Sequence, residues 1–139
     1  MSTYLDSSFL VKLYVPEQDS AAAVTLASRI LGTPRISTLT EVEVASAILR
    51  RSPKANADSL YATYRRNRGD GLYTLVELNT ATFSIARGLV ERYARQFSLR
   101  SLDAVQLATA LQIGAREFVT LDGDLTKAAE AEGLTVPRI

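Results

Sequence analysis

Residues 4–14 read YLDSSFLVKLY, and this stretch decides the fold because it joins a buried strand to a helix through one acidic residue. The apolar run Tyr4-Leu5 is short and stops at Asp6, as a buried strand does. A serine that follows Asp6 can cap a helix, which Pro16 then ends. The stretch therefore predicts a buried strand, an acidic residue at its end and a helix that follows.

The rest of the chain alternates short apolar runs with longer periodic segments. We predict further strands at residues 35–38, 72–78 and 117–121, and an edge strand at 134–136. Caps, breakers and apolar spacing predict helices at 20–31, from 38 or 40 to 51, 52–68, 80–97, from 98 or 101 to 113, and 122–132. Strands that alternate with helices indicate a three-layer α/β/α domain, in which helices cover both faces of a parallel sheet.

Composition limits the chemistry that this chain can perform. The 139 residues fit a single domain, 1–139, and 47% hydrophobic with 22% charged residues is typical of globular proteins. There is no cysteine and no histidine, which excludes disulfides, thiolate sites, Ser–His–Asp triads and histidine-ligated zinc. Catalysis must therefore use carboxylates, hydroxyls, lysine, arginine or a bound ion.

The sequence has no signal-peptide pattern, and no apolar run approaches the roughly 20 residues of a membrane span. We therefore expect a cytoplasmic protein that does not contact membranes.

Acidic residues lie where ligands bind in parallel sheets, at the carboxyl ends of strands and at the starts of helices. The candidates are Asp6, Glu43, Asp103 and Asp122. Carboxylates that meet in one pocket raise each other's pKa, and a hard divalent ion such as Mg²⁺ or Mn²⁺ resolves this conflict. The sequence therefore predicts a metal site.

Each acidic residue also has a purely structural interpretation. Asp6 and Asp122 can cap helices, and the helix dipole alone favours Asp103 in a first turn. Glu43 can form a capping box with Thr40. Against this, Asp6 and Asp103 interrupt apolar runs, and aspartate is almost never buried unless it is paired or coordinated.

Four segments resemble VapC-type PIN-domain toxins and occur in the order typical of that family. They are residues 4–14, STLTEVEVASA at 37–47, SLDAVQLATA at 101–110 and FVTLD at 118–122. The third segment is the most specific of them. The resemblance implies a PIN-like domain with a central parallel sheet of four to five strands, and a metal-dependent endoribonuclease activity.

The resemblance also implies roles for individual residues. Asp6 and Asp103 would be the principal metal ligands, and Glu43 and Asp122 would complete the catalytic and metal-binding set. The hydroxyls of Ser8 and Thr120 would orient the carboxylates or the waters around them.

Two of these positions have a neighbouring alternative. Glu43 fits the second segment better than Glu41, because it lies six residues after Ser37 and before Val-Ala-Ser-Ala. Asp122 fits the Thr-x-Asp pattern of the fourth segment better than Asp124. Whether Glu41 or Asp124 contributes stays open at this point.

The same resemblance implies several partners. VapC-like toxins cut structured RNAs, typically at loops of tRNA or rRNA, and usually form homodimers. A VapB-like antitoxin covers the acidic site with its C-terminal segment. Basic residues concentrate between residues 50 and 100, and Arg65, Arg66 and Arg68 are candidate RNA-binding residues. On exposed helix faces, however, such charges are more often merely solvated.

Two other functions fit parts of the sequence. One is a phosphatase with Asp6 as its nucleophile, but haloacid-dehalogenase-type enzymes have a second aspartate where this chain has Ser8. The other is a PIN-like binding module without catalysis. Four intact acidic positions argue against this module, because a domain without catalysis has no reason to keep like charges together.

Overall fold

Short parallel strands form the central sheet of this protein, in a computed structural model that describes residues 2–139. They are β1 Thr3–Leu5, β2 Arg35–Ser37, β3 Thr74–Val76 and β4 Glu117–Val119. Their order across the sheet is β3-β2-β1-β4, and each neighbouring pair is parallel. The chain builds one side of the sheet from β1 through β3 and then crosses to the other side of β1. The strand order therefore reverses between β1 and β4, which is where ligands bind in parallel sheets.

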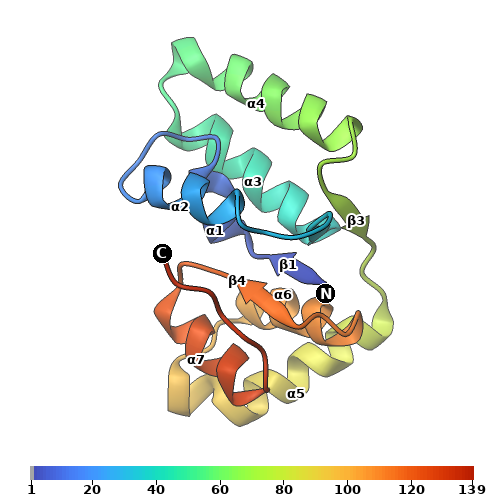
Figure 1. Cartoon of the computed structure of the whole chain (residues 1–139). Coiled ribbons are helices and arrows are strands. Elements are labelled where there is room, and N and C mark those ends of the chain that lie inside the picture. The colour runs from blue at the N-terminus through green and yellow to red at the C-terminus, as the bar shows by residue number, and fades with distance from the viewer. Residues whose placement is uncertain (1) are drawn as a thin grey trace.

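Helices cover both faces of this sheet. Those in residues 2–139 are α1 Ser7–Lys12, α2 Ser20–Ala27, α3 Thr38–Arg51, α4 Lys54–Gly69, α5 Thr80–Phe97, α6 Ser101–Gln112 and α7 Gly123–Ala131. Figure 1 shows α1 to α4 on one face and α5 to α7 on the other. The predicted fold class, an α/β domain with a parallel sheet flanked by helices, is confirmed.

The strands separate two apolar cores, because neighbouring residues of a strand point to opposite faces. Tyr4 and Phe118 belong to the core under α5, α6 and α7, and their rings stack with centroids 5.7 Å apart. Leu5 and Val119, the next residue on each strand, belong to the core under α1 to α4. Since these side chains are almost completely buried, both faces of the sheet are closed to water.

Several predicted element boundaries are wrong, and the strands expected at 72–78 and 117–121 are shorter, at Thr74–Val76 and Glu117–Val119. The expected edge strand at 134–136 is a single bridge between Thr135 and Glu117, and Pro137 has no N–H with which to extend it. The first helix ends at Lys12, four residues before Pro16, and residues 13 and 14 form a turn. The second helix ends at Ala27 rather than at residue 31.

No helix among residues 2–139 combines the length and the apolar character that crossing a membrane requires.

Candidate active site

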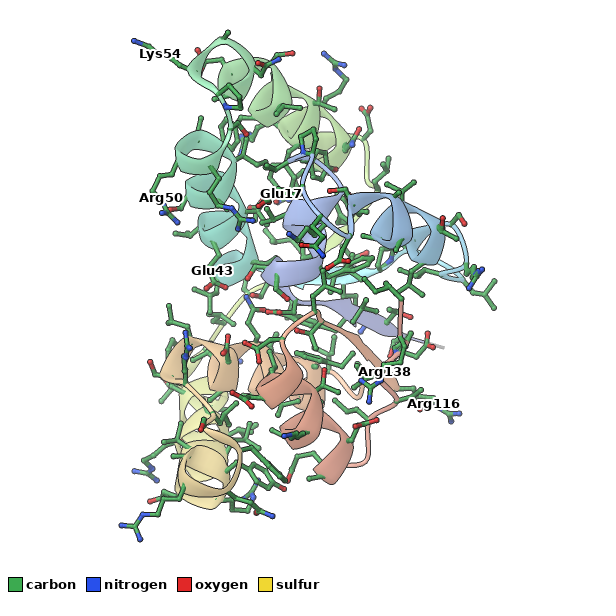
Figure 2. All side chains as sticks on the ribbon, turned by 90° about the vertical axis from the view of Figure 1, so that its left-hand side faces the viewer. Glu17, Glu43, Arg50, Lys54, Arg116 and Arg138 are labelled. Atoms are coloured by element: carbon green, nitrogen blue, oxygen red, sulfur yellow. The ribbon has the colours of Figure 1, made fainter. Side chains whose placement is uncertain are left out.

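A pocket beyond the carboxyl ends of β1 and β4 is lined by all of the predicted acidic residues, Asp6, Glu43, Asp103 and Asp122. Asp6 follows β1 and Glu43 lies on α3. Asp103 lies in the first turn of α6, and Asp122 lies between β4 and α7. Figure 2 shows Glu43 at the end of α3 nearest to the lower half of the molecule. The fold therefore brings together carboxylates that are distant in the sequence.

Asp6 is held through one of its two carboxylate oxygens. The side chain is 2% exposed, and its Oδ2 accepts hydrogen bonds from Ser8 Oγ at 2.6 Å and Thr120 Oγ1 at 2.8 Å. No donor from residues 2–139 is hydrogen-bonded to Oδ1. Burial raises the pKa of Asp6, the two hydroxyl hydrogen bonds oppose this shift, and the charge of Glu43 adds to it. The carboxylate thus has a fixed orientation and a free oxygen.

The hydroxyls of Ser8 and Thr120 also join the two loops that carry Asp6 and Asp122. The two hydroxyl oxygens are 3.1 Å apart. Ser8 Oγ accepts a hydrogen bond from the backbone N–H of Leu121 at 3.0 Å, and Thr120 Oγ1 accepts one from that of Asp122 at 3.1 Å. Rotation of either hydroxyl would therefore disturb both Asp6 and the start of α7.

Glu43 is oriented by two residues that the sequence analysis did not single out. Its Oε1 accepts hydrogen bonds from Ser7 Oγ at 3.0 Å and from Gln106 Nε2 at 2.6 Å. The capping box proposed for Glu43 is wrong, because Ser37 caps α3 and its capping-box partner is Thr40. Gln106 could have been noticed as a polar residue inside the apolar run of the third segment, whereas Ser7 carries no such pattern.

Asp122 has the capping role that its structural interpretation predicts, but only through one oxygen. Its Oδ1 accepts hydrogen bonds from the backbone N–H groups of Asp124 at 2.9 Å and Leu125 at 3.0 Å, at the start of α7. Within residues 2–139, no donor is hydrogen-bonded to Oδ2. Asp122 can therefore cap α7 and still offer an oxygen to the pocket.

Asp103 is a second carboxyl group whose ionisation the pocket disturbs. Burial raises its pKa to about 7, and the charges of Asp6, Asp122 and Glu43 contribute to the same shift. Arg100 acts in the opposite direction. A cation beside these carboxylates would offset both the burial of their charge and their mutual repulsion.

The donor set fits a hard divalent ion. The pocket offers carboxylate oxygens and no nitrogen or sulfur ligand from histidine or cysteine, which is the set that Mg²⁺ and Mn²⁺ prefer. No three acidic side chains of residues 2–139 are close enough together to hold an ion as they stand. An ion bound here by one or two carboxylates would keep several waters, and only one shared by three or more would require side-chain rotations.

Comparison with known proteins identifies the family. The sequence model of the PIN domain matches residues 3–131. The chain belongs to the PIN-domain family. It is 33% identical to ribonuclease VapC46 of Mycobacterium tuberculosis, over 96% of this chain and 94% of that relative. The resemblance to VapC-type PIN-domain proteins stated from the sequence is therefore confirmed.

Solved structures share the fold of this PIN domain. VapC20 of Mycobacterium tuberculosis, described as a toxin that cleaves the sarcin–ricin loop, has a TM-score of 0.78 and 18% identity, over 99% of each chain. A toxin–antitoxin complex from Klebsiella pneumoniae has a TM-score of 0.65 and 20% identity, over 98% of this chain and 96% of that one. At these identities the likeness concerns the fold.

The neighbouring alternatives Glu41 and Asp124 do not line the acidic pocket of the PIN domain. Glu41 Oε2 accepts a hydrogen bond from Tyr64 OH at 3.0 Å and lies 3.1 Å from Arg68 Nε, so this carboxylate is directed toward α4. Asp124 is exposed on α7. Of the two choices that the sequence left open, the geometry favours Glu43 and Asp122.

The arginines nearest to the pocket are not those predicted to contact RNA. Arg65 and Arg66 are exposed on α4 and do not line the pocket, and Arg68 pairs with Glu41. Arg50 and Arg51 instead line the pocket. Arg100 lines its extension, a neighbouring cavity that shares Glu43, Asp103 and Asp122 with it. Figure 2 shows Arg50 on the same side of α3 as Glu43.

Two of these three arginines are available for a ligand. Arg51 forms an ion pair with Glu17. Arg50 Nε donates to Ser46 Oγ at 2.9 Å, and neither Arg50 nor Arg100 has an ion-pair partner among residues 2–139.

Proposed function

We propose that this PIN-domain protein is an Mg²⁺- or Mn²⁺-dependent endoribonuclease and the toxin of a toxin–antitoxin pair. The observation that supports it is the pocket formed by Asp6, Glu43, Asp103 and Asp122 at the reversal of strand order. The 33% identity with a VapC ribonuclease supports the same activity.

The metal ligands follow from the oxygens that the fold leaves free. Asp6 Oδ1 and the carboxylate of Asp103 are the principal ligands in this proposal, with Glu43 Oε2 and Asp122 Oδ2 completing the set. When bound, a divalent ion supplies positive charge for the phosphate oxygens and makes a water molecule more acidic. Without such a cation, the acidic pocket would repel the phosphodiester.

The residues of the chain then have distinct tasks. Ser8 and Thr120 keep Asp6 in one orientation through its Oδ2. Of Glu43 Oε2 and Asp122 Oδ2, the oxygen that does not bind the ion accepts a proton from the attacking water. The water attacks phosphorus in line with the 3′ oxygen, the bond between phosphorus and that oxygen breaks, and the 3′ oxygen takes a proton from solvent.

The proposed substrate is a loop of a structured RNA, in rRNA or tRNA. Support comes from the VapC20 fold relative, a toxin that cleaves the sarcin–ricin loop. Arg50 and Arg100 are placed to contact the RNA phosphates, since both line the acidic pocket or its extension.

The proposed protein partners are a second copy of the chain and a VapB-like antitoxin. A homologous fold has been crystallised in a toxin–antitoxin complex. A basic side chain of an antitoxin would neutralise the carboxylates in place of the metal, which gives inhibition a physical basis.

The direct test is cleavage of RNA by metal-stripped protein after Mg²⁺ is added back. We expect Asp6→Asn and Asp103→Asn each to lower the rate by at least about 100-fold, because each removes a charged metal ligand. Asp124→Asn is the matched control, since it removes one acidic charge near the pocket without lining it. Activity like wild type in either pocket variant would contradict the proposal.

A further inference from the structure

Gln106 is a buried polar residue in the middle of α6. It stands in a run of buried residues from Ala104 to Ala110, and it is 0% exposed. A buried amide is costly unless its polar atoms find hydrogen-bond partners. Its partners therefore indicate why a polar side chain occupies this position.

Two hydroxyl groups determine which way the amide points. Gln106 Oε1 accepts hydrogen bonds from Tyr4 OH and from Thr40 Oγ1, the second at 3.1 Å. Thr40 Oγ1 also accepts one from the backbone N–H of Ser37 at 3.1 Å, so its own proton can be donated. The phenol of tyrosine carries its proton at neutral pH, so Tyr4 can donate as well. Because the carboxylate of Glu43 only accepts hydrogen bonds, the amide nitrogen must face it, and the amide oxygen faces the two hydroxyls.

The amide nitrogen consequently faces Glu43. Gln106 Nε2 donates to Glu43 Oε1 at 2.6 Å, and Ser7 Oγ donates to the same oxygen at 3.0 Å. Because both hydrogen bonds go to Oε1, Oε2 is the oxygen left for the pocket. We infer that Gln106 is a positioning residue that holds Glu43 with Oε2 available to the metal and the RNA, an inference that rests on the function proposed above.

The network also connects the elements that carry the other ligands. Tyr4 lies on β1, two residues before Asp6, and Gln106 lies on α6, one turn after Asp103. Thr40 lies one turn before Glu43 on α3. Residues one turn apart share a helix face, so the hydrogen bonds of Gln106 lie directly beneath the carboxylates. Gln106 therefore sets the position of Glu43 relative to β1 and α6.

The test is Gln106→Met, which keeps the length of the side chain and removes the amide. We expect Mn²⁺ binding, measured by calorimetry, to weaken about tenfold, as is usual when a residue that orients a metal ligand is lost. We also expect kcat for RNA cleavage to fall while KM stays unchanged, because the buried Gln106 cannot touch RNA. The matched control is Gln112→Met on the same helix, because Gln112 binds Asn79 and does not line the pocket. It should bind Mn²⁺ like wild type.

A double-mutant cycle shows whether Gln106 acts through Glu43. In a Glu43→Gln background, Gln106→Met should weaken Mn²⁺ binding no further, because the carboxylate that it positions is gone. A tenfold loss that persists in this background would overturn the inference. So would a lower melting temperature of Gln106→Met with unchanged Mn²⁺ affinity of the folded protein, since that is the result of a purely structural role.

A second variant covers the case in which Gln106→Met does not fold. Tyr4→Phe keeps the buried ring and removes one of the two hydroxyls that orient the amide. Mn²⁺ affinity should then fall about threefold, a part of the loss expected for the whole amide. Unchanged affinity in Tyr4→Phe would overturn the inference.

Asp103→Asn separates failure of this inference from failure of the proposed function. If Asp103→Asn abolishes Mn²⁺ binding and Gln106→Met does not alter it, only the role of Gln106 is wrong. If Asp103→Asn binds Mn²⁺ like wild type, the proposed function itself is wrong.

Discussion

The ionisation of Asp103 makes the stability of the metal-free protein depend on pH. Burial and neighbouring carboxylates raise its pKa from 3.8 to about 7, so between these values the folded protein holds a proton that the unfolded chain has lost. The free energy of unfolding therefore falls as pH rises through this window and levels off above about pH 7. Asp103→Asn removes this contribution. We expect the variant to equal wild type near pH 4 and to be more stable by about 2 kcal/mol at pH 8, a value reduced for the partial exposure of the side chain.

Urea unfolding in the presence of EDTA, from pH 4 to pH 8, measures this difference. Asp6 keeps its own raised pKa in the variant, so a weaker dependence of the same sign should remain. Asp124→Asn is exposed and should follow the wild-type curve. A variant Asp103→Asn that is less stable than wild type at pH 8 would show that the pocket does not disfavour the charged form of this residue.

At the scale of single residues, the sequence located the acidic set and the hydroxyls that hold Asp6, but not the groups that hold Glu43. Asp6 and Asp122 were found because the end of a parallel strand is visible as the end of an apolar run. The contact between Ser7 and Glu43 depends on how α1 and α3 pack, and no local pattern reports that packing. Glu41 and Glu43 lie two residues apart on α3, so only the face that each presents in the folded chain separates them.

Among the helices, α3 and not α4 carries basic side chains that line the acidic pocket. Arg50 lies two turns beyond Glu43 on α3 and lines the same pocket, whereas Arg65 on α4 does not. In an Asp6→Asn background that does not cleave, we expect Arg50→Ala to weaken RNA binding about fivefold. The slope of log K against log salt concentration should also fall by about one, which corresponds to one lost phosphate contact. Fluorescence anisotropy over a series of KCl concentrations measures both quantities.

Arg65→Ala is the matched control for this experiment, because both arginines are exposed on helices. It should change RNA binding less than twofold, as is usual for a solvated surface charge. If Arg65→Ala weakens binding more than Arg50→Ala does, the RNA lies along α4, as the arginine-rich sequence suggests.

Helices were easier to predict than the ends of strands. The periodic apolar positions of α5 and α6 determine helices over nearly the residues predicted. The strands have only three residues each, so one tertiary hydrogen bond more or less decides where they stop. The segment around Thr135 shows this, because its pairing to β4 amounts to one bridge and not to a fifth strand.

At the scale of the whole molecule, the proposed metal would connect the helices of the two faces of the sheet. Glu43 comes from the α1 to α4 side and Asp103 from the α5 to α7 side. An ion that binds only the folded protein stabilises it by about 2.7 kcal/mol at a hundred times its Kd. For a chain of 139 residues we therefore expect Mn²⁺ at that concentration to raise Tm by about 8 °C.

At one fixed Mn²⁺ concentration, this rise in Tm should be larger at pH 8 than at pH 6. With a pKa of about 7, Asp103 must release its proton before it can bind metal, so protons compete with Mn²⁺ at the lower pH. Thermal unfolding with and without Mn²⁺ at both pH values measures the difference. Asp124→Asn should keep the wild-type rise, and Asp103→Asn should lose most of it. The same rise in Asp103→Asn as in wild type would mean that Mn²⁺ binds elsewhere, and the acidic pocket would then lose its proposed role as a metal site.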